Sequence, residues 1–498
     1  MSEQIGRRAL WGSITTGGGN IGGFLIRLIA RAALARIIVP EDFGTFALAW
    51  SYAEIIGILG GVSFDQTLIQ LKEGYDRLEG TVFWMTLAVF VLVFLVSLAF
   101  WPILAAMEGD AIADCFLLIA AVRIPSRLGN VLVASLHRAF RYHFVAGLQL
   151  LSVAVTTVVV LAMAAYNPSP TVLVVRDLLP QIFVLVVLTV VALRSGKASQ
   201  FFGFDRRSAK AVWKLGRSLL WNRGFEVVYT EIDRLVVGHA FGERTLGFYD
   251  QARWLAGLPK ALIAPIGGAV GLRTLSALHG DPERRDRAFD LTQYVITRVL
   301  MVMAIGTIVA PDLVVRVILG PDWLGAAEVL RWLSLWLVIS PLSGNFKVLL
   351  FALQDFRPLY LAIAVEAATL SAAVFPLVIW FDAIGMALAT TVATASRLIV
   401  LIIGASRTVT QGKGTYLPTI LATIGAAGLG MLSRELTSAM DLVPSALLGL
   451  AVAYVTFLAA TWLIERARLK AELRYIMLRL KRKQPAAPAP DPTDDAAE

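Results

Sequence analysis

The sequence has few of the residues that build disulfides, metal centres and soluble surfaces. Its 498 residues include one cysteine, Cys115, and four histidines that lack metal-ligand spacing. A single thiol excludes an intramolecular disulfide and a multi-cysteine metal or iron–sulfur site, so we expect neither a metal nor another cofactor. Charged residues make up only 16% of the chain, hydrophobic residues make up 57%, and the mean hydropathy is +0.71. One globular core cannot bury that much apolar surface, so lipid is the expected solvent.

Apolar stretches long enough to cross a bilayer recur along the whole chain. A spanning helix needs about 20 mostly apolar residues, and fourteen stretches meet this requirement. We therefore predict an all-α integral membrane protein with about 14 transmembrane helices. The predicted spans lie near residues 11–38, 45–64, 82–105, 114–136, 144–166, 172–193, 216–240, 247–272, 291–318, 326–352, 359–380, 384–404, 417–433 and 444–465.

The basic residues fall in alternate connections between these spans. A nucleic-acid-binding protein gathers Lys and Arg on one soluble face, so the net charge of +9 does not predict a nucleic-acid partner here. The amino terminus, every second connection and the carboxyl tail hold 27 of the 45 basic residues. The opposite connections hold only Arg244 and Arg434. By the positive-inside rule both termini are cytoplasmic, and the first span is expected to remain as an uncleaved anchor.

No connection on the outer side is long enough to form a soluble domain, so we expect no enzymatic activity. After residue 465, apolar residues recur at helical spacing among basic ones. This pattern predicts an amphipathic helix that lies on the cytoplasmic surface of the membrane and binds anionic lipids. The final segment is rich in Pro, Ala and Asp and is expected to be disordered. The predicted parts are an N-terminal six-helix lobe (1–200), a C-terminal six-helix lobe (201–410), an additional helix pair (411–465), the basic amphipathic helix (466–483) and the tail (484–498).

The two predicted lobes show a weak internal repeat. Placing Gly44 on Gly247 aligns RAALARIIVPEDFGTFALA with RLVVGHAFGERTLGFYDQA and sets Arg31 opposite Arg234. Two later matches have offsets of 209 and 216 instead of 203, so the offset grows steadily through small insertions. This pattern favours duplication. Because each half has an even number of helices, we expect a pseudo-two-fold axis along the membrane normal and a cavity between the halves.

Three segments carry a resemblance to a known family. They are LARIIVPEDFGTFALA (34–49), FGERTLGFYDQA (241–252) and LGPDWLGAAEVLRWLSL (319–335). The sequence resembles polysaccharide flippases of the multidrug/oligosaccharidyl-lipid/polysaccharide exporter superfamily, of the colanic-acid or exopolysaccharide type, over residues 5–465. Many such proteins have twelve helices, and the additional pair here is similar to that of the fourteen-helix lipid II flippases.

The resemblance implies a multi-pass protein of the bacterial inner membrane. Its expected substrate is an undecaprenyl-pyrophosphate-linked oligosaccharide, moved from the cytoplasmic to the periplasmic leaflet for exopolysaccharide, capsule or O-antigen synthesis. A polysaccharide polymerase and chain-length-control proteins are the partners that such a role implies.

Charged residues inside the predicted spans cost about 2.5–3.5 kcal/mol each at a helix centre, so they need a partner, a cavity or a function. Arg27 and Arg31 lie four residues apart on one helix face, and Arg123 and Arg127 repeat that spacing. The candidate substrate-binding residues are Arg27, Arg31, Arg123, Arg127, Arg223, Arg234 and Arg253, and the acids that could carry a coupled ion or pair with arginine are Glu54, Glu226 and Asp250.

Two interpretations of these charges stay open. In the first, the charged residues form structural ion pairs across helices, with Glu231 and Asp233 as further acids. In the second, the arginines line an aqueous cavity that binds pyrophosphate. Guanidinium groups stay charged and match phosphate oxygens bidentately, which favours the cavity. Transport would then proceed by alternating access of the two lobes. The alternatives are a drug exporter of the same superfamily, for which an acidic cavity is expected, and a membrane polysaccharide polymerase.

Overall fold

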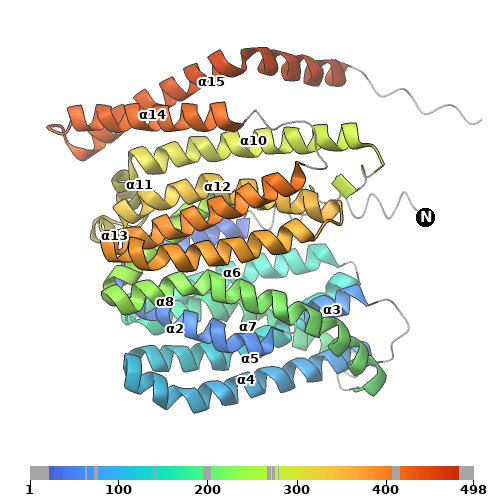
Figure 1. Ribbon diagram of the computed structural model, residues 1–498. Coiled ribbons are helices and arrows are strands. Elements are labelled where there is room, and N and C mark those ends of the chain that lie inside the picture. Colours follow the sequence, from blue (N-terminus) through green and yellow to red (C-terminus); the bar gives the residue numbers. More distant parts are fainter. Residues whose placement is uncertain are drawn as a thin grey trace, which may run out of the picture. The chain divides into compact units, whose positions relative to one another are not determined.

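The computed structural model describes residues 22–481 except 62–63, 72–76, 140, 195–202, 266–270, 272–274, 277, 279 and 407–415. Every regular element in this part of the chain is a helix (Figure 1), which confirms the predicted all-α class. The internal contacts divide the chain into two compact units, Met1–Gln411 and Gly412–Glu498, and each is described by itself.

The first six predicted spans correspond to helices, but the second has different ends. α2 begins at Pro40 and ends at Gly57 instead of covering 45–64. Proline suits the first helical position because its missing N–H is not needed there, and the glycines from Gly57 onward favour an end to the helix. A 3₁₀ turn, η1 (Ile58–Gly60), and the short helix α3 (Phe64–Gln70) follow. The others are residues 22–35, α4 (Leu78–Glu108), α5 (Asp110–Arg138), α6 (Tyr142–Tyr166) and α7 (Pro170–Arg194).

Two long helices fold back on themselves and match the predicted hairpins. α8 (Arg206–Pro265) breaks at Gly242, whose φ of 79° favours glycine, and covers the predicted spans 216–240 and 247–272 as far as it is described. α13 (Arg357–Ala405) breaks at Phe381 and Asp382 and covers the spans 359–380 and 384–404. We call the segments before and after each break its first and second arms.

The predicted span 291–318 is wrong, because two helices replace it. α10 (Pro282–Val309) ends before Ala310, which has φ −132° and ψ 56°, and α11 (Pro311–Ile318) then begins. Pro311 cannot donate a backbone hydrogen bond, and its ring disfavours helical geometry at the preceding residue. A 3₁₀ turn, η4 (Pro321–Trp323), leads into α12 (Ala326–Ala352).

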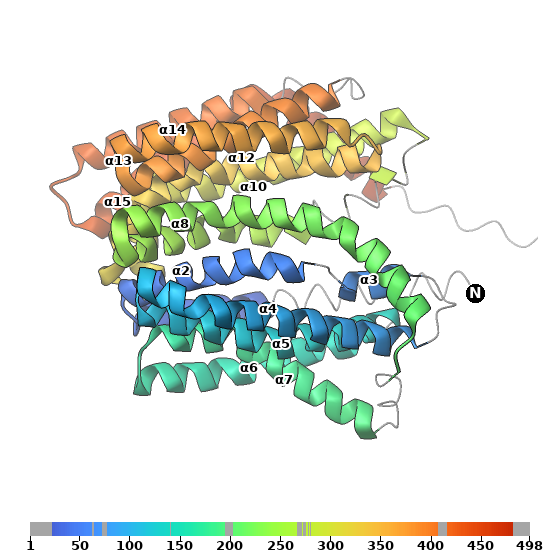
Figure 2. The same cartoon turned by 60° about the horizontal axis from the view of Figure 1, so that its bottom comes forward.

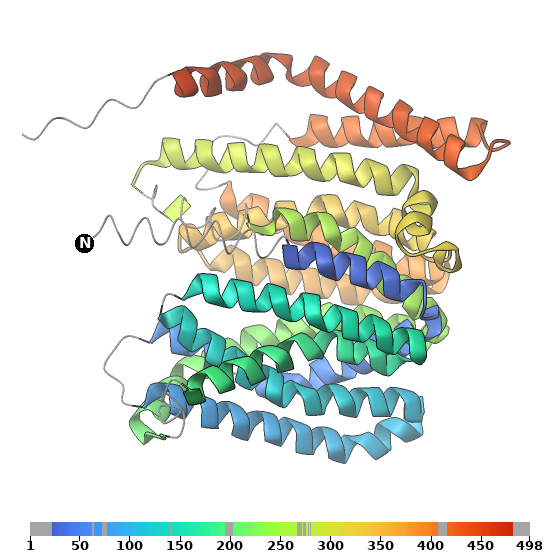
Figure 3. The same cartoon turned by 180° about the vertical axis from the view of Figure 1, so that it is seen from behind.

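Helix α8 lies between two groups of helices in the first unit. It packs against α2 on one side and against α12 and α13 on the other, as Figure 2 shows. In the N-terminal group α5 packs against α2, α3, α4, α6 and α7, and the α4–α5 hairpin is visible from behind in Figure 3. α8 therefore connects the two halves that the sequence repeat relates.

The contact between α2 and the second arm of α8 follows the repeat. Gly44 lies against the backbone carbonyl of Glu243, and Gly247 lies against that of Pro40. A Cβ atom on either glycine would collide with the carbonyl oxygen it faces. Both the two glycines and the two carbonyls differ by the offset of 203 found in the sequence. This reciprocal contact is the pattern that a two-fold relation between the halves produces.

Nine helices among the described residues are long and apolar enough to cross a membrane, and they make the chain a multi-pass membrane protein. α13, which folds back, is one of the nine, whereas α8, which carries many charges, is not. In the second unit, α14 (Tyr416–Leu436) packs against α15 (Leu442–Lys481). α15 continues through residue 465, where the sequence suggested a separate interfacial helix, and the tail 484–498 lies outside the described residues.

Candidate functional site

Asp250 pairs with two arginines that come from different halves of the chain. Arg31, in helix 22–35, donates from Nη2 to Asp250 Oδ2 at 2.8 Å. Arg234, in the first arm of α8, donates from Nη2 to Asp250 Oδ1 at 2.6 Å. Gln251 also accepts from Arg31 Nε at 3.0 Å. The two arginines that the sequence repeat aligns therefore meet at one carboxylate, which is only 3% exposed.

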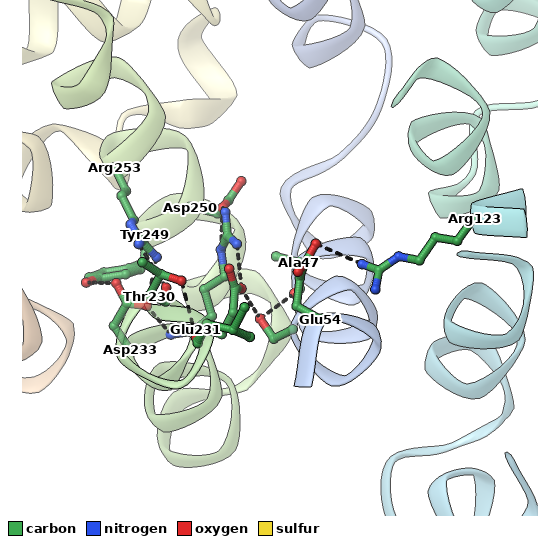
Figure 4. Close-up of polar contacts among 12 residues, drawn as sticks. Ala47, Glu54, Arg123, Thr230, Glu231, Asp233, Tyr249, Asp250 and Arg253 are labelled. Carbon is green, nitrogen blue, oxygen red and sulfur yellow. Dashed lines mark hydrogen bonds and ion pairs between the residues drawn. The ribbon is translucent and has the colours of Figure 1, made fainter. Parts of the chain in front are cut away.

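Two further acids and one arginine extend this contact into a balanced network (Figure 4). Glu231 accepts from Arg234 at 2.7 Å and from the Ser51 hydroxyl of α2 at 2.9 Å. Asp233 accepts from Arg253 at 2.7 Å. Three carboxylates thus meet three guanidiniums, and each carboxylate has at least two hydrogen bonds, which offsets its desolvation. We call this set the Asp250 cluster: Arg31, Glu231, Asp233, Arg234, Asp250 and Arg253.

The Asp250 cluster ties helix 22–35 and α2 to α8 near one end of the helices. Arg31 lies four residues before helix 22–35 ends, and Asp250 lies eight residues after the break at Gly242. The predicted topology assigns this end to the periplasmic side. The geometry favours structural pairing for Arg31, Arg234 and Arg253, and substrate binding by these three stays a prediction.

Arg123 of α5 is held in place by α2. Its Nη2 lies 2.9 Å from Glu54 Oε1, and its Nη1 donates to the carbonyl of Ala53 at 2.6 Å. The guanidinium also lies over the Trp50 ring, 5.4 Å from the centroid. A side chain on Gly57 would collide with Arg123 Nη1, so glycine provides the room. Of the two roles considered for Glu54, ion carrier and pairing partner, pairing is the one that the structure shows.

A pocket next to this pair contains the other arginine of α5. The Arg127 guanidinium lies 5.4 Å from the centroid of the Phe90 ring and makes no ion pair with a described residue. The buried Thr86 hydroxyl has no hydrogen-bond partner in the described part of the chain. We call this cavity the first pocket; its lining includes Glu54, Gly57, Asp65, Thr86, Phe90, Arg123, Arg127 and Val227.

Arg27 lies in a separate cavity, the second pocket, which helix 22–35, α5, α6 and α7 surround. Its side chain is exposed and has no ion pair among the residues that the structure describes. Arg27 and Arg127 are therefore candidate arginines for which no ion pair with a described acid is found, although Asp65 lines the first pocket together with Arg127. The side chains of Arg223 and Glu226 lie outside the described residues.

The sequence analysis missed a buried pair within α13. Glu366 of the first arm is 3% exposed and accepts from Arg397 of the second arm at 3.0 Å. The Tyr229 hydroxyl of α8 donates to the same carboxylate at 2.6 Å. The signal was present, since Glu366 and Arg397 interrupt the apolar spans 359–380 and 384–404.

The family is settled by residues 33–328, which match the model of a family described as polysaccharide biosynthesis protein. This match covers more than half of the chain and includes most of the Asp250 cluster.

The chain belongs to the polysaccharide biosynthesis protein family.

Two curated relatives of this polysaccharide biosynthesis protein are themselves named for polysaccharide synthesis. The succinoglycan biosynthesis transport protein ExoT of Rhizobium meliloti (strain 1021) is 26% identical over 326 residues, which are 63% of each chain. The teichuronic acid biosynthesis protein TuaB of Bacillus subtilis (strain 168) is 21% identical over 364 residues, 70% of this chain and 72% of TuaB. The aligned region thus spans less than two thirds of ExoT.

Solved structures show that this polysaccharide biosynthesis protein shares a transporter fold. The lipid II flippase MurJ, in an inward closed conformation, superposes with a TM-score of 0.66 over 92% of this chain and 100% of MurJ, at 14% identity. An inward-facing multidrug resistance MATE family transporter of the MOP superfamily gives a TM-score of 0.62 over 79% of this chain and 98% of that one, at 12% identity.

Proposed function

We propose that this protein flips a lipid-linked oligosaccharide across the bacterial inner membrane and catalyses no chemical conversion. The family membership, the fold shared with MurJ and the relation to ExoT support a transporter in polysaccharide synthesis. Both termini are cytoplasmic in this proposal, because the basic connections then lie inside. The substrate's undecaprenyl chain would stay in lipid while its pyrophosphate and glycan pass between the two halves of the fold.

The observation that carries the proposal is the contrast between paired and unpaired arginines. Arg31, Arg234 and Arg253 are neutralised in the Asp250 cluster, and Arg123 is neutralised by Glu54. Arg27 and Arg127 each face a pocket without such a partner among the described residues. A guanidinium without a direct ion-pair partner inside a membrane protein is costly unless it meets water or an anion. We therefore assign the pyrophosphate to Arg27 and Arg127.

The Asp250 cluster has a different role in this proposal. It holds α8 against helix 22–35 and α2 near the end assigned to the periplasm, so it closes that side while the pockets receive substrate from the cytoplasm. Export of about two negative charges from an inside-negative cell gains about 4–5 kcal/mol at 100 mV. That gain is comparable to the cost of breaking a buried ion pair, about 3–5 kcal/mol, so the potential alone can bias transport outward.

The test is flipping of undecaprenyl pyrophosphate and its glycan-bearing form in liposomes with an inside-negative potential. Arg27→Gln and Arg127→Gln should each slow flipping at least tenfold while the melting temperature in detergent stays close to that of the wild type. Arg284→Gln is the matched control, because Arg284 is 79% exposed at the start of α10.

Equal rates in all three variants would overturn the assignment of the pyrophosphate. Glu54 and Asp65 also line the first pocket, so a drug exporter predicts binding of an organic cation instead. Binding of such a cation without binding of either lipid would favour that alternative.

A further inference from the structure

The second pocket carries a set of polar side chains that pyrophosphate binding does not explain. It lies between helix 22–35, α5, α6 and α7, and its polar lining consists of Arg27, Asn130, Gln149, Ser152 and Gln181. The rest of the lining is glycine or aliphatic, without an aromatic or acidic residue. This composition disfavours a cation or a stacked aromatic ligand.

Three of the five polar side chains have no partner in the described part of the chain. Gln181 donates to the carbonyl of Asp177 at 3.2 Å, and Ser152 donates to the backbone carbonyl of Gln149 at 2.7 Å. The side chains of Arg27, Asn130 and Gln149 make no such bond. Each amide offers two donor hydrogens and an acceptor oxygen. Arg27 and Gln149 are exposed and Asn130 is partly buried, so these groups are accessible to a ligand that has both donors and acceptors.

Neighbouring hydroxyl groups of a sugar ring supply such donors and acceptors. An amide can donate to one hydroxyl oxygen and accept from the next, and the guanidinium of Arg27 adds further donors. The open side of the pocket suits a bound glycan, because Arg27 and Gln149 are both exposed. Val133 and Val153 are among the aliphatic residues of the lining and can contact the C–H groups of the ring.

The second pocket also lies close to the first along α5. Arg127 and Val131 line the first pocket, whereas Gly129, Asn130 and Val133 line the second. Asn130 follows Arg127 by three residues, which is about 4.5 Å along the axis of a helix and on a neighbouring face. In a lipid-linked oligosaccharide the first sugar is bonded directly to the pyrophosphate, so a short separation is what one ligand requires.

We propose that Asn130 and Gln149 recognise the first sugar of the lipid-linked oligosaccharide, beside the pyrophosphate held by Arg27 and Arg127. This inference rests on the proposed function and identifies the part of the substrate that binds in the second pocket. The two amides then set specificity for the sugar, while the arginines bind every pyrophosphate-linked lipid alike.

The experiment compares two probes on the full-length protein in detergent. One is undecaprenyl pyrophosphate without sugar, and the other is the glycan-bearing lipid fraction extracted from the strain that makes the polysaccharide. Asn130→Ala and Gln149→Ala should each weaken binding of the glycan-bearing lipid about fivefold, and together about twentyfold, as expected for lost neutral hydrogen bonds. Affinity for the bare lipid should not change. Ala146→Phe, which fills the second pocket, should act in the same direction, and Asn167→Ala, outside both pockets, should have no effect.

The outcomes separate this inference from the function on which it rests. Wild-type protein that binds neither lipid would defeat the proposed function. Wild-type protein that binds both lipids, with the amide variants unchanged for the glycan-bearing one, would defeat only the sugar site. Equal losses for both lipids would also defeat it, because the amides would then not distinguish sugar from pyrophosphate.

Discussion

Arg31 and Asp250 form an ion pair across 219 residues of sequence, and it joins the two halves of the repeat. Asp250 shares its carboxylate with Arg234, which belongs to the other arm of the same helical hairpin. In the proposed alternating access, separation of helix 22–35 from α8 would leave Arg234 paired with Asp250, and Arg31 would lose its partner. The ion pair of Arg31 with Asp250 is therefore the charged contact that would have to break for these two helices to separate.

Removal of the Asp250 charge should destabilise the protein, and removal of Arg31 as well should restore it. Asp250→Asn leaves three arginines with two acids, at a cost of about 3–5 kcal/mol for a broken buried pair. Arg31→Ala combined with Asp250→Asn leaves Arg234 with Glu231 and Arg253 with Asp233, so the charges balance again. Melting temperatures in detergent should show the single variant well below the double one.

The control for this cycle pairs Asp250→Asn with Arg284→Ala, which changes a distant exposed arginine. Distant sites add independently, so this combination should be no more stable than Asp250→Asn alone. If it recovers as much as the Arg31 combination does, net charge and not the specific pair governs stability.

A methyl group at Gly247 should separate α2 from α8. Gly247→Ala places its Cβ against the carbonyl of Pro40. The backbone cannot move aside as a flexible side chain can. We therefore expect overpacking to lower the free energy of unfolding by at least about 2 kcal/mol. Gly257→Ala is the matched control on the same helix arm, because no other side chain and no backbone outside its own helical turns lies within 4 Å of its added Cβ. Higher helix propensity should make that variant neutral or up to about 1 kcal/mol more stable. Equal melting temperatures for the two variants would contradict the close approach.

The effects of substituting Glu366 and Arg397 on the free energy of unfolding should be coupled, because the two residues form a buried ion pair. Glu366→Gln leaves the Arg397 charge without its acid and weakens the hydrogen bond from Tyr229, so unfolding should become easier by about 3–5 kcal/mol. Adding Arg397→Gln should recover part of that loss. Thermal unfolding of the two single variants and the double variant measures the coupling energy, and strict additivity would show that Glu366 and Arg397 act independently.

The asymmetry of basic residues predicts the orientation of the chain. Reporter fusions at connections with few basic residues should report the periplasm, and fusions at basic connections should report the cytoplasm. Swapped signals at two or more positions would overturn the topology. The positions for the periplasm are Asp110, Pro168, Asp322 and Met440, and those for the cytoplasm are Gly203, Glu283 and Thr410.

Most helices could be predicted because their apolar runs are long and their ends carry loop residues. The sequence was least informative where a helix stops inside an apolar run. No charged residue lies between Arg298 and Pro311, where α10 ends and α11 begins, so hydropathy alone predicts one continuous span. A proline in α5, Pro125, lies within a continuous helix, so proline by itself does not distinguish the two cases.

The charged residues could be located from the sequence, but their partners could not. Helical spacing places Arg27 and Arg31 on one face of one helix, and it contains no information about which helix lies opposite. The sequence left Glu54 and Asp250 open as acids that could pair with any of these arginines, whereas the structure pairs Glu54 with Arg123 and Asp250 with Arg31 and Arg234. Such pairs depend on the packing of helices that are far apart in sequence.

The reciprocal contact of Gly44 and Gly247 has a consequence for the ancestry of the protein. Two identical subunits related by a two-fold axis make every contact twice: if one residue of the first subunit touches a second residue of its partner, the same two positions touch with the subunits exchanged. A half-length ancestor, present as two copies, would have associated through this same surface as a homodimer. One ancestral glycine would then have served both subunits at once, and after gene fusion both positions would still need glycine, because each faces a backbone carbonyl.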